Sequence, residues 1–136
     1  MATWIALLRG VGGGIRPLPM RDLTVALEGI GLKDVRTYIQ SGNIVFSSAK
    51  SATRLAGEIE RCIEKKFGFH SRTFVLSVGD LQRAAAGNPF PQADQEPKTL
   101  HLFFLAKPAK ADRLLGVDTT ARNWRTVGKV LELAKE

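Results

Sequence analysis

The apolar positions of residues 1–78 alternate between strand-like runs and helix-like spacing. Four runs have the length and residue types of β-strands: 3–9, 35–40, 43–48 and 72–78. Between them, apolar residues recur three and four positions apart in 20–30 and again in 51–68, which is the spacing of an amphipathic helix. The predicted order of elements is therefore strand, helix, strand, strand, helix, strand.

Local signals support the ends of these elements. Gly31 is suited to terminate the first helix, while Ser51 is a suitable N-cap and Gly68 a suitable C-terminal stop for the second. Ser41 and Gly42 form a two-residue connection between the second and third strands, and a glycine there can take the positive φ of a tight turn. The pattern predicts a β-hairpin at this point.

Right-handed crossovers around a hairpin favour a ferredoxin-like βαββαβ unit, in which the first and third strands are central. Connections then alternate between the two ends of the sheet. Arg9, the hairpin turn at 40–43 and the start of the fourth strand at His70 and Arg72 are accordingly expected at one shared end. Residues 4–8 are all apolar, which indicates a strand buried on both faces.

Residues 79–136 supply the natural cover for the second face. Their pattern predicts a helix near 80–86, a strand near 99–105, a helical fragment at 109–115, and a final helix capped by Thr119 or Thr120. The expected fold class is α+β: a ferredoxin-like first half, 1–78, with a smaller α/β second half, 79–136, packed on the other face of the sheet in one compact unit.

Charge and composition narrow the choice of partners. The chain of 136 residues has 20 Lys and Arg against 13 Asp and Glu, a net charge of +7, which favours anionic partners such as nucleic acid or phosphorylated metabolites. The basic residues are scattered, so a solvated basic surface is an equally good explanation. No apolar run approaches a membrane span and no signal peptide is recognisable, so we expect a cytoplasmic protein. Cys62, the single cysteine, excludes an intramolecular disulfide and fits a core thiol.

The candidate site gathers at the shared end of the sheet. Arg9, Gln40, Ser41 and Asn43 offer a cation, two amides and a hydroxyl, which suits binding of a polar anion better than catalysis, because no general base accompanies them. Gly10 opens a glycine-rich loop whose backbone N–H groups are able to hold an anion, although the loop has no nucleotide-binding signature. The alternative is that Gln40 and Asn43 pair across the turn.

The start of the predicted final helix adds three candidates to this site. Arg122, Arg125 and Lys129 follow each other at three and four residues, so they would share a helix face able to meet phosphates or simply solvent. Asn123 is suited either to cap backbone or to face a ligand, and Trp124 fits a core anchor better than a stacking platform.

Metal and RNA-stacking chemistry find no support in the sequence. Neither His70 nor His101 has a companion at metal-ligand spacing, so we predict no metal and no cofactor. The RNP1 pattern is absent from 43–48, which argues against an open RNA-stacking sheet.

Four segments resemble a known family. They are Ile5-Ala-Leu-Leu-Arg-Gly, Leu18-Pro-Met, Val35-Arg-Thr-Tyr-Ile-Gln-Ser-Gly-Asn-Ile-Val-Phe-Ser and Thr120-Ala-Arg-Asn-Trp-Arg-Thr, which are similar to the domain of unknown function 1697. The resemblance covers nearly the whole chain and implies a bacterial-type cytoplasmic α+β protein with a ferredoxin-like first half and no established activity. Two departures are a glycine loop without the family's asparagine and lysine, and a shortened stretch between Leu115 and Gly116.

The leading functional hypothesis is a non-enzymatic binding module for an anionic ligand, with nucleic acid as one candidate, that uses Arg9, the hairpin turn and Arg122. One rival is an enzyme acting on a small phosphorylated or carboxylated metabolite, with His70 as its proton carrier. A second rival is a protein-interaction module without a pocket. The sequence does not indicate the oligomeric state.

Overall fold

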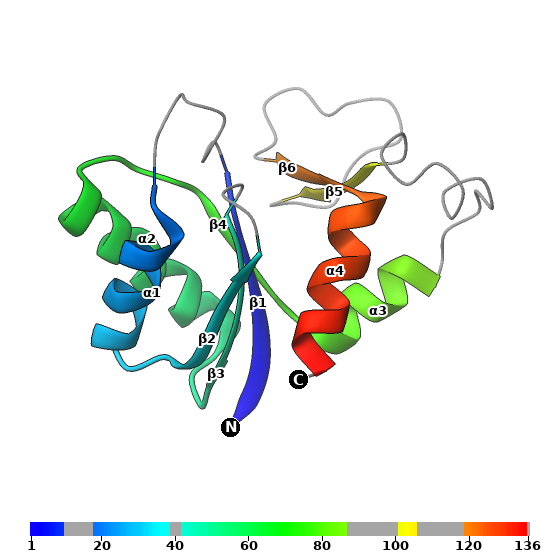
Figure 1. Ribbon diagram of the computed structural model, residues 1–136, viewed down its shortest axis with the longest axis horizontal. Coiled ribbons are helices and arrows are strands. Elements are labelled where there is room, and N and C mark those ends of the chain that lie inside the picture. The colour runs from blue at the N-terminus through cyan, green and yellow to red at the C-terminus, as the bar shows by residue number, and fades with distance from the viewer. Residues whose placement is uncertain (10–17, 39–41, 87–100, 106–118, 136) are drawn as a thin grey trace.

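The computed structural model describes residues 1–9, 18–38, 42–86, 101–105 and 119–135 (Figure 1). The first half contains β1 (Ala2–Leu8), α1 (Met20–Gly29), β2 (Lys33–Tyr38), β3 (Asn43–Ser48), α2 (Ala52–Phe67) and β4 (Thr73–Ser77). The second half contains α3 (Val78–Ala86), β5 (His101–Leu105), β6 (Thr119–Asn123) and α4 (Trp124–Lys135). The predicted order of elements in the first half is confirmed.

The main sheet has the strand order β2-β3-β1-β4, with every neighbouring pair antiparallel. This is the arrangement expected of a βαββαβ unit, with β1 and β3 in the centre. Ile5 of β1 lies opposite Val45 of β3 on one side and Leu76 of β4 on the other. The α+β fold class predicted from the sequence is confirmed.

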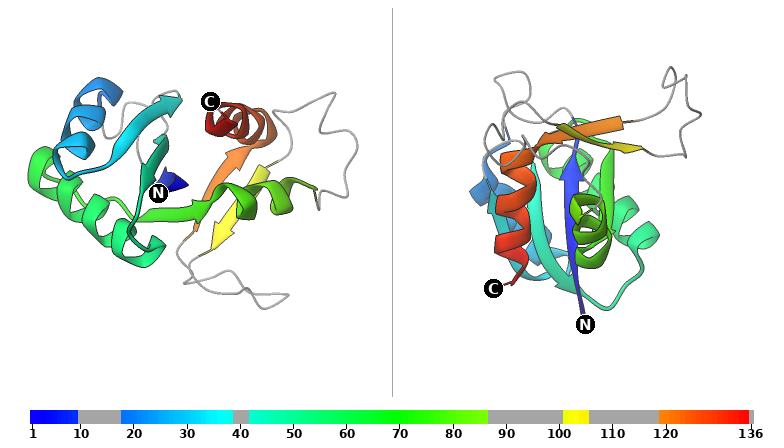
Figure 2. Two further views of the ribbon diagram at one scale, coloured as in Figure 1. Left: turned by 90° about the horizontal axis from the view of Figure 1, so that it is seen from below. Right: turned by 90° about the vertical axis from the view of Figure 1, so that its right-hand side faces the viewer.

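Alternation along β1 divides the apolar residues between two cores. Ala6 and Leu8 face α1 and α2, whereas Ile5 and Leu7 face α3 and α4, and all four are at most 1% exposed. The two pairs of helices lie on opposite faces of the sheet (Figure 2). The second half therefore covers the second face, as the unbroken apolar run of β1 predicted.

Capping and turn residues act at the positions expected of them. The Ser51 side chain accepts a hydrogen bond from the backbone N–H of Arg54 at 3.4 Å, and Gly68 ends α2 in the left-handed conformation with φ of 79°. Gly42, just before β3, also has φ of 79°. A Cβ atom at Gly42 would lie 2.7 Å from the Leu8 Cβ, so this turn requires glycine for both conformation and space.

The second half differs from the sequence-based expectation at its last helix. Thr119 and Thr120 are not helix caps: they lie in β6, which pairs antiparallel with β5. The helix begins only at Trp124, and Asn123 caps it by accepting the Thr126 N–H at 2.9 Å. A threonine pair ahead of a helical apolar stripe resembles a cap, but β-branched residues also favour strands, and pairing with β5 decides between the two.

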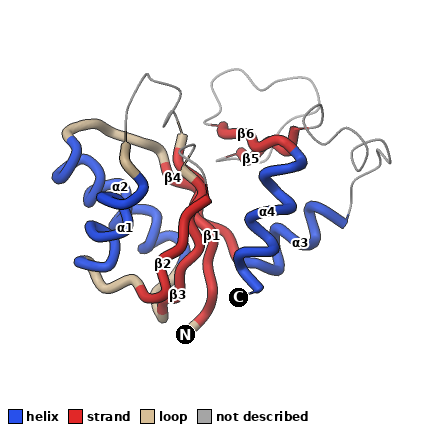
Figure 3. Tube along the Cα trace, in the orientation of Figure 1, coloured by secondary structure: helices blue, strands red, loops and turns tan. Residues whose placement is uncertain are grey.

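Because α4 begins only at Trp124, the prediction of a basic helix face that includes Arg122 is wrong. Because Arg122 belongs to β6 and not to α4, it does not share a helical face with Arg125 and Lys129. The small β5–β6 sheet instead lies beyond α3 and α4, towards the end of the main sheet where β1 stops (Figure 3). The predicted helical fragment at 109–115 lies outside the described residues, as does the shortened stretch at 115–116.

Candidate functional site

Three segments that are distant in sequence meet where β1 ends. The Leu8 N–H donates to the Gly42 carbonyl at 2.9 Å, and the Arg9 N–H donates to the Arg72 carbonyl at 3.0 Å. The Ser71 hydroxyl donates to the Arg9 carbonyl at 2.8 Å. We call this end of the sheet, formed by Leu8 and Arg9, Gly42, and Ser71 and Arg72, the rim. The predicted convergence of the first strand, the hairpin turn and the fourth strand is confirmed.

A fourth segment reaches the rim through Arg122 of β6. Its Nη2 donates to the Leu8 carbonyl at 2.8 Å and to the Gly42 carbonyl at 3.3 Å, and its Nε donates to Oδ1 of Asn43. The residue is only 7% exposed, and burial lowers the pKa of its guanidinium to about 10. Arg122 is therefore still cationic at neutral pH, and it ties the second half of the chain to the end of β1.

Asn43 completes this buried junction. It is fully buried, its Nδ2 donates to the Tyr38 carbonyl at 3.0 Å, and its Oδ1 receives the Arg122 Nε–H. Both side chains lie at the shared end of the sheet, where the sequence placed them. Their hydrogen bonds run to other parts of the protein, so their role in a rim site is to hold the backbone in position.

The exposed cations at the rim are Arg9 and Arg72. Leu8 lies opposite Thr73, so continuing the register by one residue places Arg9 opposite Arg72, in agreement with the hydrogen bond between their backbones. Directly opposite residues on antiparallel strands share one face, with Cβ atoms about 5 Å apart. The Arg72 guanidinium lies 6.0 Å from the Phe74 ring centre, on the face that packs against α3 and α4.

The sequence-based site omitted Arg72, although the predicted topology already placed this residue at the shared end of the sheet. Arg9 follows the last residue of β1 and Arg72 precedes the first residue of β4, so the antiparallel register makes them partners. Register between β1 and β4 is set by matching buried faces of both strands, and single-residue periodicity does not reveal it.

The remaining predicted site residues divide into two groups. Gly10, Gln40 and Ser41 lie outside the described residues. Asn123 uses its side chain as the α4 cap, and Trp124 opens α4 with a side chain outside the described part.

A known family of sequences matches nearly the whole length of the chain. The profile of the family described as "Protein of unknown function (DUF1697)" matches residues 1–131. The chain belongs to this family. No curated protein sequence matches it.

Among solved structures, the architecture of this DUF1697 protein is similar to the following one. It is described as "The structure of conserved bacterial protein SP0830 from Streptococcus pneumoniae", with 22% sequence identity and a TM-score of 0.71. The match covers 100% of this chain and 99% of that one. At this identity the likeness shows a shared fold, and it is consistent with the family assignment.

Other titratable groups near the rim are few within the described ranges. His70 is 63% exposed, and its Nε2 lies 3.5 Å from Oε1 of Glu60. No group of three His, Cys, Asp or Glu residues in the described ranges is arranged to hold a metal ion. None of the described helices combines the length and apolar composition needed to cross a bilayer.

Proposed function

We propose that this protein is a non-enzymatic binding module for a phosphate-bearing anion, with single-stranded nucleic acid as the first ligand to test. Arg9 and Arg72 at the rim would contact the ligand, and Arg122 and Asn43 would hold the rim in shape. The observation that carries the proposal is the pairing of Arg9 with Arg72 at the open end of two adjacent strands.

Arg9 and Arg72 place two cations at directly opposite positions on neighbouring strands. A phosphate contacted by both guanidinium groups would accept a charge-assisted hydrogen bond from each. Both arginines are exposed. The arrangement therefore favours an anion that two cations reach together.

Hydrogen bonds fix the backbone conformation of the rim before a ligand binds. Hydrogen bonds donated by Leu8, Arg9 and Ser71 join its segments, and Arg122 of β6 donates to the Leu8 carbonyl. Side chains anchored on a fixed backbone lose less conformational entropy on binding than side chains on an unsupported loop. The net charge of +7 adds long-range attraction for polyanions.

Fluorescence anisotropy with a labelled single-stranded oligonucleotide tests the proposal across a salt series. If two phosphates are neutralised, log K should fall with log salt with a slope of about −1.4, since single strands contribute about −0.7 per contact. A parallel thermal-shift series with inorganic phosphate and pyrophosphate separates a nucleic-acid site from a small-phosphate site, because only the first requires a chain of phosphates.

The deciding variant is Arg9→Gln/Arg72→Gln. Its matched control is Lys33→Gln/Lys129→Gln, which removes the same charge from exposed positions at the start of β2 and on α4. We expect the rim variant to abolish the salt-dependent binding and the control to retain most of it. Equal weakening in both would show that net charge alone attracts the ligand, and the rim would not be a site.

A further inference from the structure

A groove between α1 and α2 is lined by residues of both helices. These two helices lie on the face of the sheet opposite α3 and α4 (Figure 2). The volume of the groove is about 680 Å³, within the range of pockets that hold a small organic molecule. The lining combines apolar side chains with charged ones: Asp22, Val25, Ala26, Ile30, Cys62, Lys65, Lys66 and Phe67.

The apolar lining of this groove is part exposed and part buried. Val25 is 66% exposed. Ile30 and Phe67 are partly buried against the core beneath, so they form a floor with continuous apolar contact to the protein interior. An apolar chain laid along this floor would remove both its own surface and that of Val25 from water.

Cationic side chains border the groove on the α2 side. Lys65 and Lys66 both line the groove together with Cys62. Lysines in the last turn also stabilise α2 through its dipole, so their presence has a purely structural explanation as well. Neither lysine forms an ion pair with the described part of the chain.

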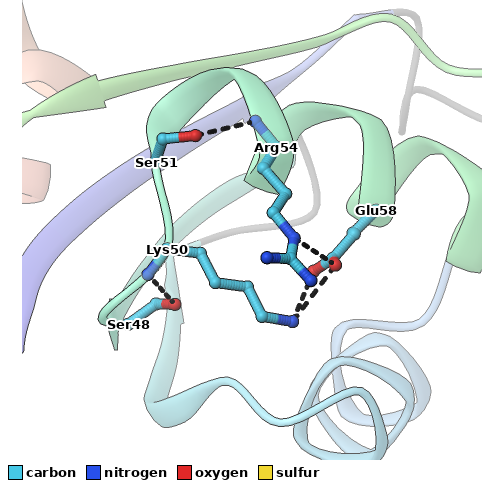
Figure 4. Close-up of polar contacts among 5 residues, drawn as sticks. All are labelled: Ser48, Lys50, Ser51, Arg54 and Glu58. Carbon is cyan, nitrogen blue, oxygen red and sulfur yellow. Dashed lines mark hydrogen bonds and ion pairs between the residues drawn. The ribbon is translucent and has the colours of Figure 1, made fainter.

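A second hollow of about 360 Å³ continues the groove, since both share Ile30, Cys62 and Lys65. It adds Lys50, Arg61 and Glu58 to the lining. The Glu58 carboxylate is already held by Lys50 at 2.8 Å and by Arg54 at 3.3 Å (Figure 4).

Together the two hollows carry more positive than negative charge. The cations are Lys50, Arg61, Lys65 and Lys66, and the anions are Asp22 and Glu58, of which Glu58 is neutralised by its partners.

We infer that this α1–α2 groove binds a small amphipathic anion, a single apolar chain with one carboxylate or similar head group, whose chain lies over Val25 and Ile30 and whose head meets Lys65 and Lys66. The site is separate from the rim and does not depend on the function proposed for it. Charge complementarity selects the occupant: an uncharged chain would leave the lysines without a partner, and a cationic one would be repelled.

Isothermal titration of the full chain with decanoate tests this assignment. Shortening the chain to octanoate should weaken binding roughly tenfold, because each buried methylene contributes a several-fold change in the binding constant. Decanol, which matches the chain but lacks the charge, should bind at least several-fold more weakly than decanoate. Equal binding of decanoate and decanol, or no saturable heat with decanoate, would overturn the assignment.

Variants locate the site. Lys65→Gln/Lys66→Gln should weaken decanoate at least fivefold, whereas Lys33→Gln/Lys129→Gln, which removes the same charge elsewhere, should not. Val25→Asp should also abolish binding, and because Val25 is 66% exposed this variant is expected to fold.

Three other results would overturn the assignment. Retention of decanoate binding by the Lys65 and Lys66 variant would place the ligand elsewhere. Sedimentation showing a dimer of this chain that Val25→Asp dissociates would make the groove an interface between copies. Loss of decanoate binding in the Arg9→Gln/Arg72→Gln variant would likewise contradict a site distinct from the rim.

Discussion

Replacing Arg122 with methionine removes the junction between β6 and the rim while retaining the length of the side chain. Among the described residues, three acceptors lose a donor: Oδ1 of Asn43 and the carbonyls of Leu8 and Gly42. The Gly42 carbonyl keeps the Leu8 N–H at 2.9 Å, so the main losses fall on the other two. A hydrogen bond to a charged group contributes about 1.5–3 kcal/mol, which gives about 3–6 kcal/mol for these two.

Removing the buried charge of Arg122 raises the free energy of unfolding, which opposes the loss of the hydrogen bonds. Burial lowers the Arg122 pKa to about 10, which corresponds to a cost of about 3 kcal/mol for holding the charge inside the protein. The methionine variant avoids that cost. At the middle of the hydrogen-bond range the difference leaves a net destabilisation of about 1 kcal/mol, so the hydrogen bonds outweigh the desolvation.

Urea denaturation followed by circular dichroism measures this difference. Arg122→Lys is the informative companion, because lysine retains the charge but lacks the planar fork that reaches two carbonyls and an amide together. We expect Arg122→Lys to destabilise the protein at least as much as Arg122→Met. An unchanged or raised free energy of unfolding in Arg122→Met, or full rescue by lysine, would refute the role assigned to this junction.

Three further predictions concern other parts of the described structure. Gly42→Ala should lower the free energy of unfolding by about 2–4 kcal/mol, and Gly68→Ala by only about 1 kcal/mol. Both glycines have φ of 79°, but a Cβ at Gly42 would meet a side-chain carbon of β1 at 2.7 Å, whereas Gly68 has open space. Equal losses in urea denaturation would contradict the clash. The hydrogen bond from Lys50 is the largest cause holding the pKa of Glu58 below its ordinary value of 4.5. The stabilisation is therefore present above pH 4.5 and lost as the pH falls through the lower folded value, so Glu58→Gln should cost about 0.5–1 kcal/mol at pH 7 and nothing in strong acid, as thermal melts across pH would show. Burial raises the pKa of the Cys62 thiol, so native protein should react with a thiol reagent far more slowly than urea-unfolded protein at pH 8, and comparable rates would contradict its burial.

The first half of the chain was largely predictable because its local signals agree with its tertiary contacts. The β3 run at 43–48, the Ser51 cap and the Gly68 stop all coincide with the observed elements. The unbroken apolar stretch of β1 also predicted correctly that both faces of the sheet are covered. In these places the amino-acid type determines the local conformation and the burial together.

The second half was less predictable because long-range pairing decides its structure. Threonine is a residue type that often caps helices, yet Thr119 and Thr120 form a strand because they pair with β5. Arg122 at helical spacing from Arg125 suggested an exposed basic face, and the structure buries it against Leu8 instead. A side chain whose partners lie 79 and 114 residues away leaves no periodic signal near its own position.

The rim proposal is tested most directly by amide chemical-shift mapping during titration with a short single-stranded oligonucleotide. We expect the largest shifts at the amides of Arg9, Gly42 and Arg72, with smaller ones along β6 near Arg122. The same titration of Arg9→Gln/Arg72→Gln should show none of them. Shifts spread evenly over the basic surface, or centred on the α1–α2 groove, would contradict an anion site at the rim.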